Sequence, residues 1–185
     1  MRADAQRNYE RVLSAAAHTF AEEGPDASLN EIARRANVGP GTLYRHFPNR
    51  QALLAAVLRE RIETLSTLAR ELMSTTDPDH ALREWLRAFL THARTDHGLG
   101  GAALTEPVDL GFDCHATIHE AAHAVVSHAQ RTGNARADAH AHDVIQLIVG
   151  IALTTSHNPD SDQPERLLGL VLDALYGSTR QPMSS

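Results

Sequence analysis

Residues 28–47, SLNEIARRANVGPGTLYRHF, constrain the fold of this chain more than any other stretch. Ser28 followed three residues later by Glu31 is a capping box, and it predicts a helix that starts one residue after Ser28. The letters NVG then supply a short turn, and Gly39 at the cap with Pro40 at the first helical position predicts a second helix. Two short helices joined by a three-residue turn form a helix-turn-helix.

The second of these helices is expected to have an inner and an outer side. Leu43 and Phe47, four residues apart, form the inner side, and at about 100° per residue Arg45 then points away from them. An outward arginine suits a base edge in the DNA major groove, most simply guanine, whose O6 and N7 match the guanidinium fork. The helix N-terminus favours a phosphate. The predicted DNA-contacting residues are Ser28, Gly39, Pro40, Gly41, Thr42, Tyr44, Arg45, His46 and Arg50.

The segment VGPGTLYRHFPNRQALL resembles the signature of the tetracycline-repressor (TetR) family, whose third helix carries a G-x-L-Y-x-x-F pattern. The resemblance covers residues 7–58 and implies an all-α fold of about nine helices. It implies a three-helix DNA-binding head, residues 1–48, and a ligand-binding and dimerisation body, residues 49–185. The family commonly has a phosphate-holding Lys after the third helix, where this chain has Pro48-Asn49-Arg50, so Arg50 or the start of the next helix is expected to take that role.

The net charge of −6 is unfavourable for a DNA-binding protein until its distribution is considered. Residues 27–61 hold six arginines against two acids, and most of the negative charge lies beyond residue 61. A basic end on an acidic body attracts DNA at one surface and keeps the remainder off it. The charge distribution therefore permits DNA binding.

Apolar positions at helical spacing predict further helices, at residues 3–23, 49–75, 78–96, 113–132, 138–156 and 164–176. The segment 144–153, VIQLIVGIAL, is apolar nearly all round, and a small body cannot easily enclose it together with the last helix. We therefore expect a homodimer in which each subunit contributes two helices to a four-helix bundle, which is also where TetR-like proteins dimerise. The predicted interface residues are Val144, Leu147, Ile148, Ile151, Leu168, Val171, Leu172 and Leu175.

The resemblance implies a small-molecule effector bound among the body helices. Residues 99–112 lack clear periodicity and predict a short helix between loops, a region that often borders the effector pocket in TetR-like proteins. Because only 4% of the chain is aromatic, we expect a mostly aliphatic pocket with a few polar groups. The candidate lining residues, all of types that also suit ordinary core packing, are Trp85, Phe89, His92, Leu104, Val108, Phe112, Cys114, Ile118 and His119.

His115, His119 and His123 are spaced by four residues, and imidazoles at that spacing can bind zinc or copper. The row rotates by about 40° per step, however, so three rings cannot easily converge on one ion. Polar residues that border a pocket or face solvent are the simpler interpretation. We predict no metal site and no cofactor.

Several other classes of protein fit this sequence less well. The single cysteine excludes an internal disulfide, and we found no nucleophile–base constellation, so we do not expect an enzyme. Without a signal pattern or an apolar run of about 18 residues, we expect a cytoplasmic protein with no membrane partner. The prediction is a transcriptional regulator, most simply a repressor that binds a palindromic double-stranded DNA operator as a dimer and is released by a small molecule. The alternatives are a metal-responsive regulator using the histidine row, or a helical ligand-binding protein or enzyme without operator specificity.

Overall fold

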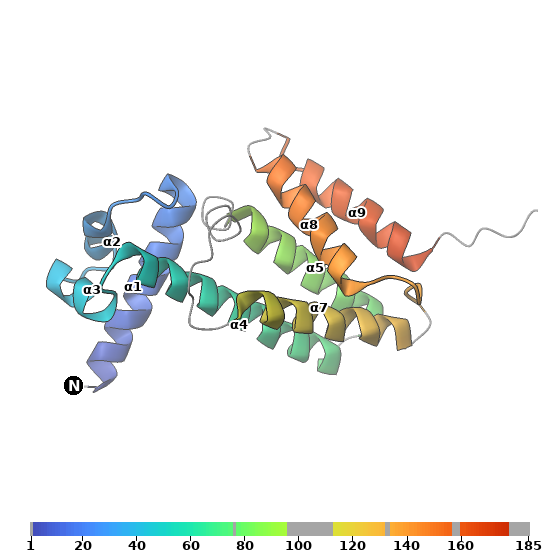
Figure 1. The fold of residues 1–185 in the computed structure, drawn as a ribbon, viewed down its shortest axis with the longest axis horizontal. Coiled ribbons are helices and arrows are strands. Elements are labelled where there is room, and N and C mark those ends of the chain that lie inside the picture. The colour runs from blue at the N-terminus through green and yellow to red at the C-terminus, as the bar shows by residue number, and fades with distance from the viewer. Residues whose placement is uncertain (1, 76, 96–112, 132–133, 157–159, 178–185) are drawn as a thin grey trace, which may run out of the picture. The chain divides into compact units, whose positions relative to one another are not determined.

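The computed structural model describes residues 2–75, 77–95, 113–131, 134–156 and 160–177. Over this part of the chain all regular structure is helical, which confirms the predicted all-α fold (Figure 1). The short helix predicted within residues 99–112 lies outside the described residues. The helices are α1 (Arg2–Glu23), α2 (Leu29–Arg35), α3 (Pro40–His46), α4 (Arg50–Thr75), α5 (Pro78–Thr95), α7 (Cys114–Arg131), α8 (Ala141–Thr155) and α9 (Gln163–Tyr176).

The chain divides into two compact units. Of the residues that the structure describes, those within 1–62 and 95–114 form the head unit, and those within 63–94 and 115–185 form the body unit. The predicted boundary at residue 48 falls just before α4, whereas the two units divide within this helix. The first half of α4 therefore packs as part of the head.

Side chains at the helix starts explain several boundaries. Asp77 Oδ1 accepts hydrogen bonds from the backbone N–H groups of Asp79 and His80, both at 3.1 Å, and so caps the start of α5. Helix α8 begins at Ala141, three residues later than predicted. The predicted first residue, Asp138, is instead paired with Arg136 in the preceding turn, with an Nε–Oδ1 distance of 2.6 Å.

The head unit is built around one apolar core to which all four of its helices contribute. Val12, Ala16 and Phe20 repeat at helical spacing along α1, and each is at most 1% exposed. They pack in one cluster with Ile32 of α2, Leu43 and Phe47 at α3, and Leu53 and Val57 of α4. The core therefore holds the two short helices, neither of which is long enough to be stable alone.

The turn between α2 and α3 is closed by a Schellman motif. Asn37 adopts a left-handed conformation with φ of 53°, and its backbone N–H donates to the Arg34 carbonyl at 3.0 Å. The N–H of Val38 donates to the Ala33 carbonyl, also at 3.0 Å. Arg11 Nη2 reaches the Asn37 carbonyl from α1 at 3.2 Å. These bonds fix the angle at which the chain enters α3.

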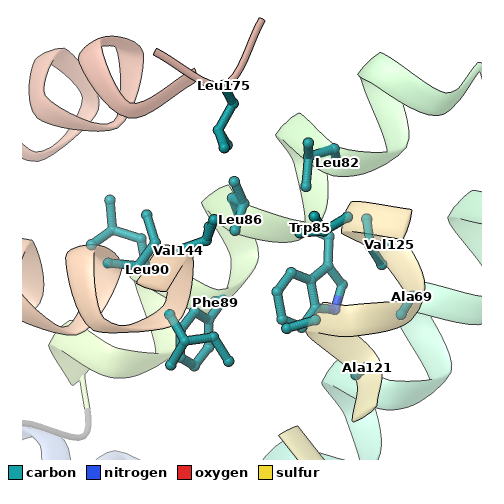
Figure 2. Packing of buried hydrophobic residues seen from close by; sticks show 14 of the residues in the cluster. Ala69, Leu82, Trp85, Leu86, Phe89, Leu90, Ala121, Val125, Val144 and Leu175 are labelled. Atoms are coloured by element: carbon teal, nitrogen blue, oxygen red, sulfur yellow. The ribbon is translucent and has the colours of Figure 1, made fainter. Parts of the chain in front are cut away.

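The body unit has a core centred on Trp85 of α5, which is fully buried (Figure 2). Its indole Nε1 donates to the Leu65 carbonyl of α4 at 3.0 Å, so the one polar atom of the ring is satisfied. The Phe89 ring stacks on Trp85 with a centroid distance of 5.5 Å. Around this pair lie Val125 of α7, Ile148 of α8 and further apolar residues of α9.

Asn37 provides a direct test of the turn. Asn tolerates the left-handed region, whereas a β-branched side chain there is strained. We expect Asn37→Val to lower the free energy of unfolding by about 1–2 kcal/mol. Asn37→Gly is the matched control and should change it by less than about 0.5 kcal/mol, because glycine adopts positive φ readily. Equal stability of the two variants in urea unfolding at fixed protein concentration would contradict this account of the turn.

Candidate nucleic-acid interface

Helix α2 starts where the capping box predicts. Ser28 is its N-cap, and Ser28 Oγ accepts from the Glu31 backbone N–H at 3.5 Å. The Glu31 carboxylate accepts from Arg34 at 2.6 and 2.7 Å and from Arg35 Nε at 3.0 Å. Hydrogen bonds from these two guanidinium groups lower the pKa of Glu31 to about 2, and the larger effect comes from Arg34. The carboxylate is therefore charged wherever the protein is folded near neutral pH.

Helix α3 presents two distinct sides, as its sequence predicts. Leu43 is fully buried and Phe47 is 3% exposed, whereas Arg45 on the opposite side is exposed. Arg45 makes no side-chain hydrogen bond or ion pair with any residue in the described part of the chain. The side chain is thus not needed for the packing of the head.

The backbone at the start of α3 is exposed to solvent. Gly39 is the N-cap, with its carbonyl accepting from Thr42 and Leu43 at 2.9 and 3.2 Å, and Pro40 occupies the first helical position. Gly41 is exposed, and a Cβ built on it would meet no atom within 4 Å. The fold of the protomer therefore does not require glycine there, which leaves close approach of another molecule as a reason for it.

The flanks of α3 differ from each other. Tyr44 is 47% exposed, an unusual exposure for a large ring. His46, by contrast, is half-buried and meets Tyr9 of α1 edge-on with a centroid distance of 5.9 Å. Tyr9 also stacks on Phe47 at 5.1 Å. His46 therefore helps to hold α3 on α1, in addition to any contact that it makes with DNA.

Arg50 has a role inside the head that the sequence did not reveal. Its Nη1 donates to the Pro25 carbonyl at 2.7 Å and also to the Ala27 carbonyl, so it anchors the loop between α1 and α2. Next to it, Asn49 Oδ1 accepts from the Ala52 backbone N–H at 2.8 Å and caps α4. The phosphate contact suggested for Arg50 stays a prediction.

The basic surface of the head is smaller than the six arginines of residues 27–61 suggest. Arg35 pairs with Glu22 and Glu23 of α1 as well as with Glu31. Arg61 is half-buried and its Nη2 lies 3.5 Å from the Ala17 carbonyl, and burial lowers its pKa. Several of the arginines are therefore used for internal packing, which makes exposed Arg45 stand out.

The candidate ligand-lining residues fall into three groups. Trp85, Phe89 and Ile118 belong to the core of the body unit and are at most 9% exposed. His92 and His119 are half-buried. Leu104, Val108, Phe112 and the side chain of Cys114 lie outside the described residues. The structure thus brings three of the nine candidates together, as core residues.

The candidate dimer residues separate into inner and outer positions. Val144, Ile148, Leu168, Leu172 and Leu175 are at most 6% exposed and pack within their own protomer. Ile151 and Val171 are half-buried. Leu147 is 54% exposed, and two leucines absent from the predicted set, Leu153 and Leu170, are 44% and 64% exposed. The outward apolar surface of α8 and α9 is thus carried by these three leucines.

The row of histidines on α7 does not form a three-ligand site. Among the described residues, no three His, Cys, Asp or Glu side chains gather as metal ligands would. The ring centres of His115 and His119 are 6.5 Å apart.

Among the described residues, no helix has both the length and the apolar run that a membrane span requires.

Comparison with known proteins agrees with this arrangement. Residues 12–57 match the family described as bacterial regulatory proteins, tetR family, and residues 77–176 match the SbtR-like C-terminal domain of transcriptional regulators. An HTH-type transcriptional regulator from Staphylococcus aureus is 30% identical over 98 residues, which are 52% of this chain and 53% of the relative. The chain therefore spans about half the length of the curated relatives that it matches.

Solved structures extend the similarity to nearly the whole chain. A TetR transcriptional regulator from Streptomyces coelicolor is 38% identical with a TM-score of 0.80, over 91% of this chain and 98% of that one. A TetR regulator from Mycobacterium vanbaalenii is 36% identical with a TM-score of 0.76, over 95% and 99% of the two chains. The chain belongs to the TetR family of transcriptional regulators.

Proposed function

We propose that this regulator binds double-stranded DNA by placing α3 in the major groove, with Arg45 reading a base edge. The observation that carries this proposal is the setting of α3: Leu43 and Phe47 are buried, whereas Arg45 is exposed and makes no side-chain hydrogen bond or ion pair with the other described residues. A bidentate guanidinium matches guanine O6 and N7. Ser28, Thr42, Tyr44 and the open N-terminus of α3 supply phosphate contacts at the edges of the groove.

Gly41 supports the same docking. It lies one turn before Arg45 on the exposed side of α3, and the protomer leaves its Cβ position empty. Without a side chain there, the helix backbone approaches the groove wall closely. Gly39 and Pro40, both exposed, extend this smooth surface to the start of the helix.

We further propose a homodimer formed through α8 and α9. Leu147, Leu153 and Leu170 expose between 44% and 64% of their surface, on two helices whose inner faces are already buried in the protomer. A matching pair of helices from a second copy covers these side chains in a four-helix bundle. A two-fold dimer implies an operator with two symmetry-related half-sites.

The regulatory part of the proposal concerns the body unit. We assign it the binding of a small-molecule effector, whose binding favours a conformation that does not fit the operator, so that the protein acts as a repressor. The SbtR-like C-terminal match at residues 77–176 supports a sensing role for this unit. Such a regulator acts in the cytoplasm, where bacterial DNA lies, and needs no catalytic residue.

Arg45 tests the DNA-binding proposal. We expect Arg45→Ala to weaken specific operator binding by about 1–3 kcal/mol and to relax the preference at one base position. Its thermal unfolding should stay unchanged, because the head makes no use of this side chain. Fluorescence anisotropy with operator and scrambled duplexes measures both affinities.

Tyr44→Phe is the control for this measurement, because the loss of a phosphate contact should weaken binding to all sequences alike. If Arg45→Ala reduces binding to operator and scrambled DNA equally, Arg45 does not read a base. Unchanged operator binding would also contradict the assignment.

Leu170 tests the dimer. Because Leu170 is 64% exposed, Leu170→Glu should leave the protomer folded, yet the dimer would have to bury an unpaired carboxylate at a cost of several kcal/mol. We expect monomers of native helicity in sedimentation velocity at micromolar concentration. The control His80→Glu places the same charge at an exposed site on α5 and should stay dimeric. A wild-type monomer, or a dimer that persists in Leu170→Glu, would contradict the interface.

A further inference from the structure

The outward side of α9 carries one large apolar side chain between two opposite charges. Leu170 is 64% exposed, more than any other large apolar residue in the described part of the chain. Arg166 lies about one turn before it and Asp173 about one turn after it, and both are exposed. At about 100° per residue, these three side chains lie within about 60° of one another around the helix. They therefore form one continuous strip, called the α9 strip below.

The two charges of the α9 strip differ in how the protomer uses them. Arg166 Nη2 lies 2.6 Å from Asp160 Oδ2, in the turn before α9. A guanidinium has five N–H donors, so this pair leaves donors for a second carboxylate. Asp173 makes no ion pair or side-chain hydrogen bond with any residue that the structure describes, whereas Glu165 on the same helix pairs with Arg87 of α5. The strip thus offers a carboxylate and several donors to another molecule.

The order of residues in the α9 strip fits a second copy of the same strip. When two copies of a helix pair antiparallel about a two-fold axis, each residue faces the one that lies equally far on the other side of the axis. Arg166 and Asp173 are equally far from the midpoint between residues 169 and 170. An axis at that midpoint therefore brings each Arg166 level with the partner's Asp173. It also brings the two copies of Leu170 together.

Other positions of the axis along the α9 strip are less favourable. An axis level with Arg166 would place two guanidinium groups against each other, and an axis level with Asp173 would do the same with two carboxylates. Like charges that face each other across an interface oppose binding. Both arrangements would also separate the two copies of Leu170. Of these three positions, only the midpoint pairs both charges and covers the leucine.

We infer that the two-fold axis of the dimer crosses α9 between Gly169 and Leu170, so that Arg166 of each subunit pairs with the partner's Asp173 beside a contact between the two leucines. This inference rests on the proposed dimer and adds the register in which the two copies pair. The partner is a second copy of this chain because the strip is complementary to itself. Since exposed ion pairs contribute little to affinity, these two pairs chiefly select the register and the partner.

The test mixes two charge reversals, Arg166→Glu and Asp173→Arg, each made in full-length protein with a different tag. In either homodimer both pairs become repulsive, whereas in the heterodimer of the two variants both are attractive again. We therefore expect about 90% heterodimer or more after subunit exchange, measured by native mass spectrometry, against the ~50% of random mixing. Both residues are exposed, so each variant should keep the helicity of the wild type in circular dichroism.

Each variant mixed with the wild type is the matched control. Such a heterodimer has one attractive and one repulsive pair, midway between its two homodimers, so mixing should stay near the random ~50%. The preference of the two-variant mixture should shrink in about 1 M salt, which screens exposed charges. Random mixing of the two variants, or a preference that salt does not reduce, would overturn this register while the dimer stands. A wild-type protein that is monomeric at micromolar concentration would overturn both.

Discussion

The burial of Leu43 and Phe47 in the head core is the constraint on which the proposed DNA-binding surface depends. A seven-residue helix has little stability of its own, so its rotation about its axis is set by which side chains it buries. The Tyr9 ring reinforces that setting by packing on both His46 and Phe47. Because these residues lie on the inner side of α3, Arg45 and Gly41 lie on its outer, exposed side.

Hydrogen bonds made by residues before and after α3 in the sequence add to this packing. The Schellman motif at Asn37 determines how the chain leaves α2, and the Arg50 bond to the Pro25 carbonyl holds the loop before α2. Both devices are polar and both lie within the head unit. Apolar burial therefore decides which side of α3 faces outward, and these hydrogen bonds hold the turn before α3 and the loop before α2.

Sequence periodicity and capping predicted much of this architecture. Ser28 as N-cap, Pro40 at the start of α3 and the inward side of α3 follow from local rules, and the structure has them all. Local rules could not show that Arg35 pairs with Glu22, because that contact joins residues 13 apart in different helices. The left-handed conformation of Asn37 could have been predicted from the sequence, since Asn is a common residue after a helix C-cap.

The outward surface of the body was harder to predict, because it also depends on how helices pack against one another. An apolar stripe shows that a helix is buried, but it does not say whether its own protomer or a partner buries it. Leu168 and Leu172 lie inside the protomer, whereas Leu170 between them is exposed, and only the packing of α9 separates them. A stacked contact between His119 and His142 is likewise invisible until α7 and α8 are placed side by side.

The most direct test of the account is footprinting of the full-length protein on the DNA upstream of its own gene. We expect protection of a palindromic segment, with two half-sites about one helical turn or a multiple of it apart, and loss of that protection in the Arg45→Ala variant. Absence of any protected segment at micromolar protein, or protection that ignores sequence, would contradict the claim that α3 reads DNA.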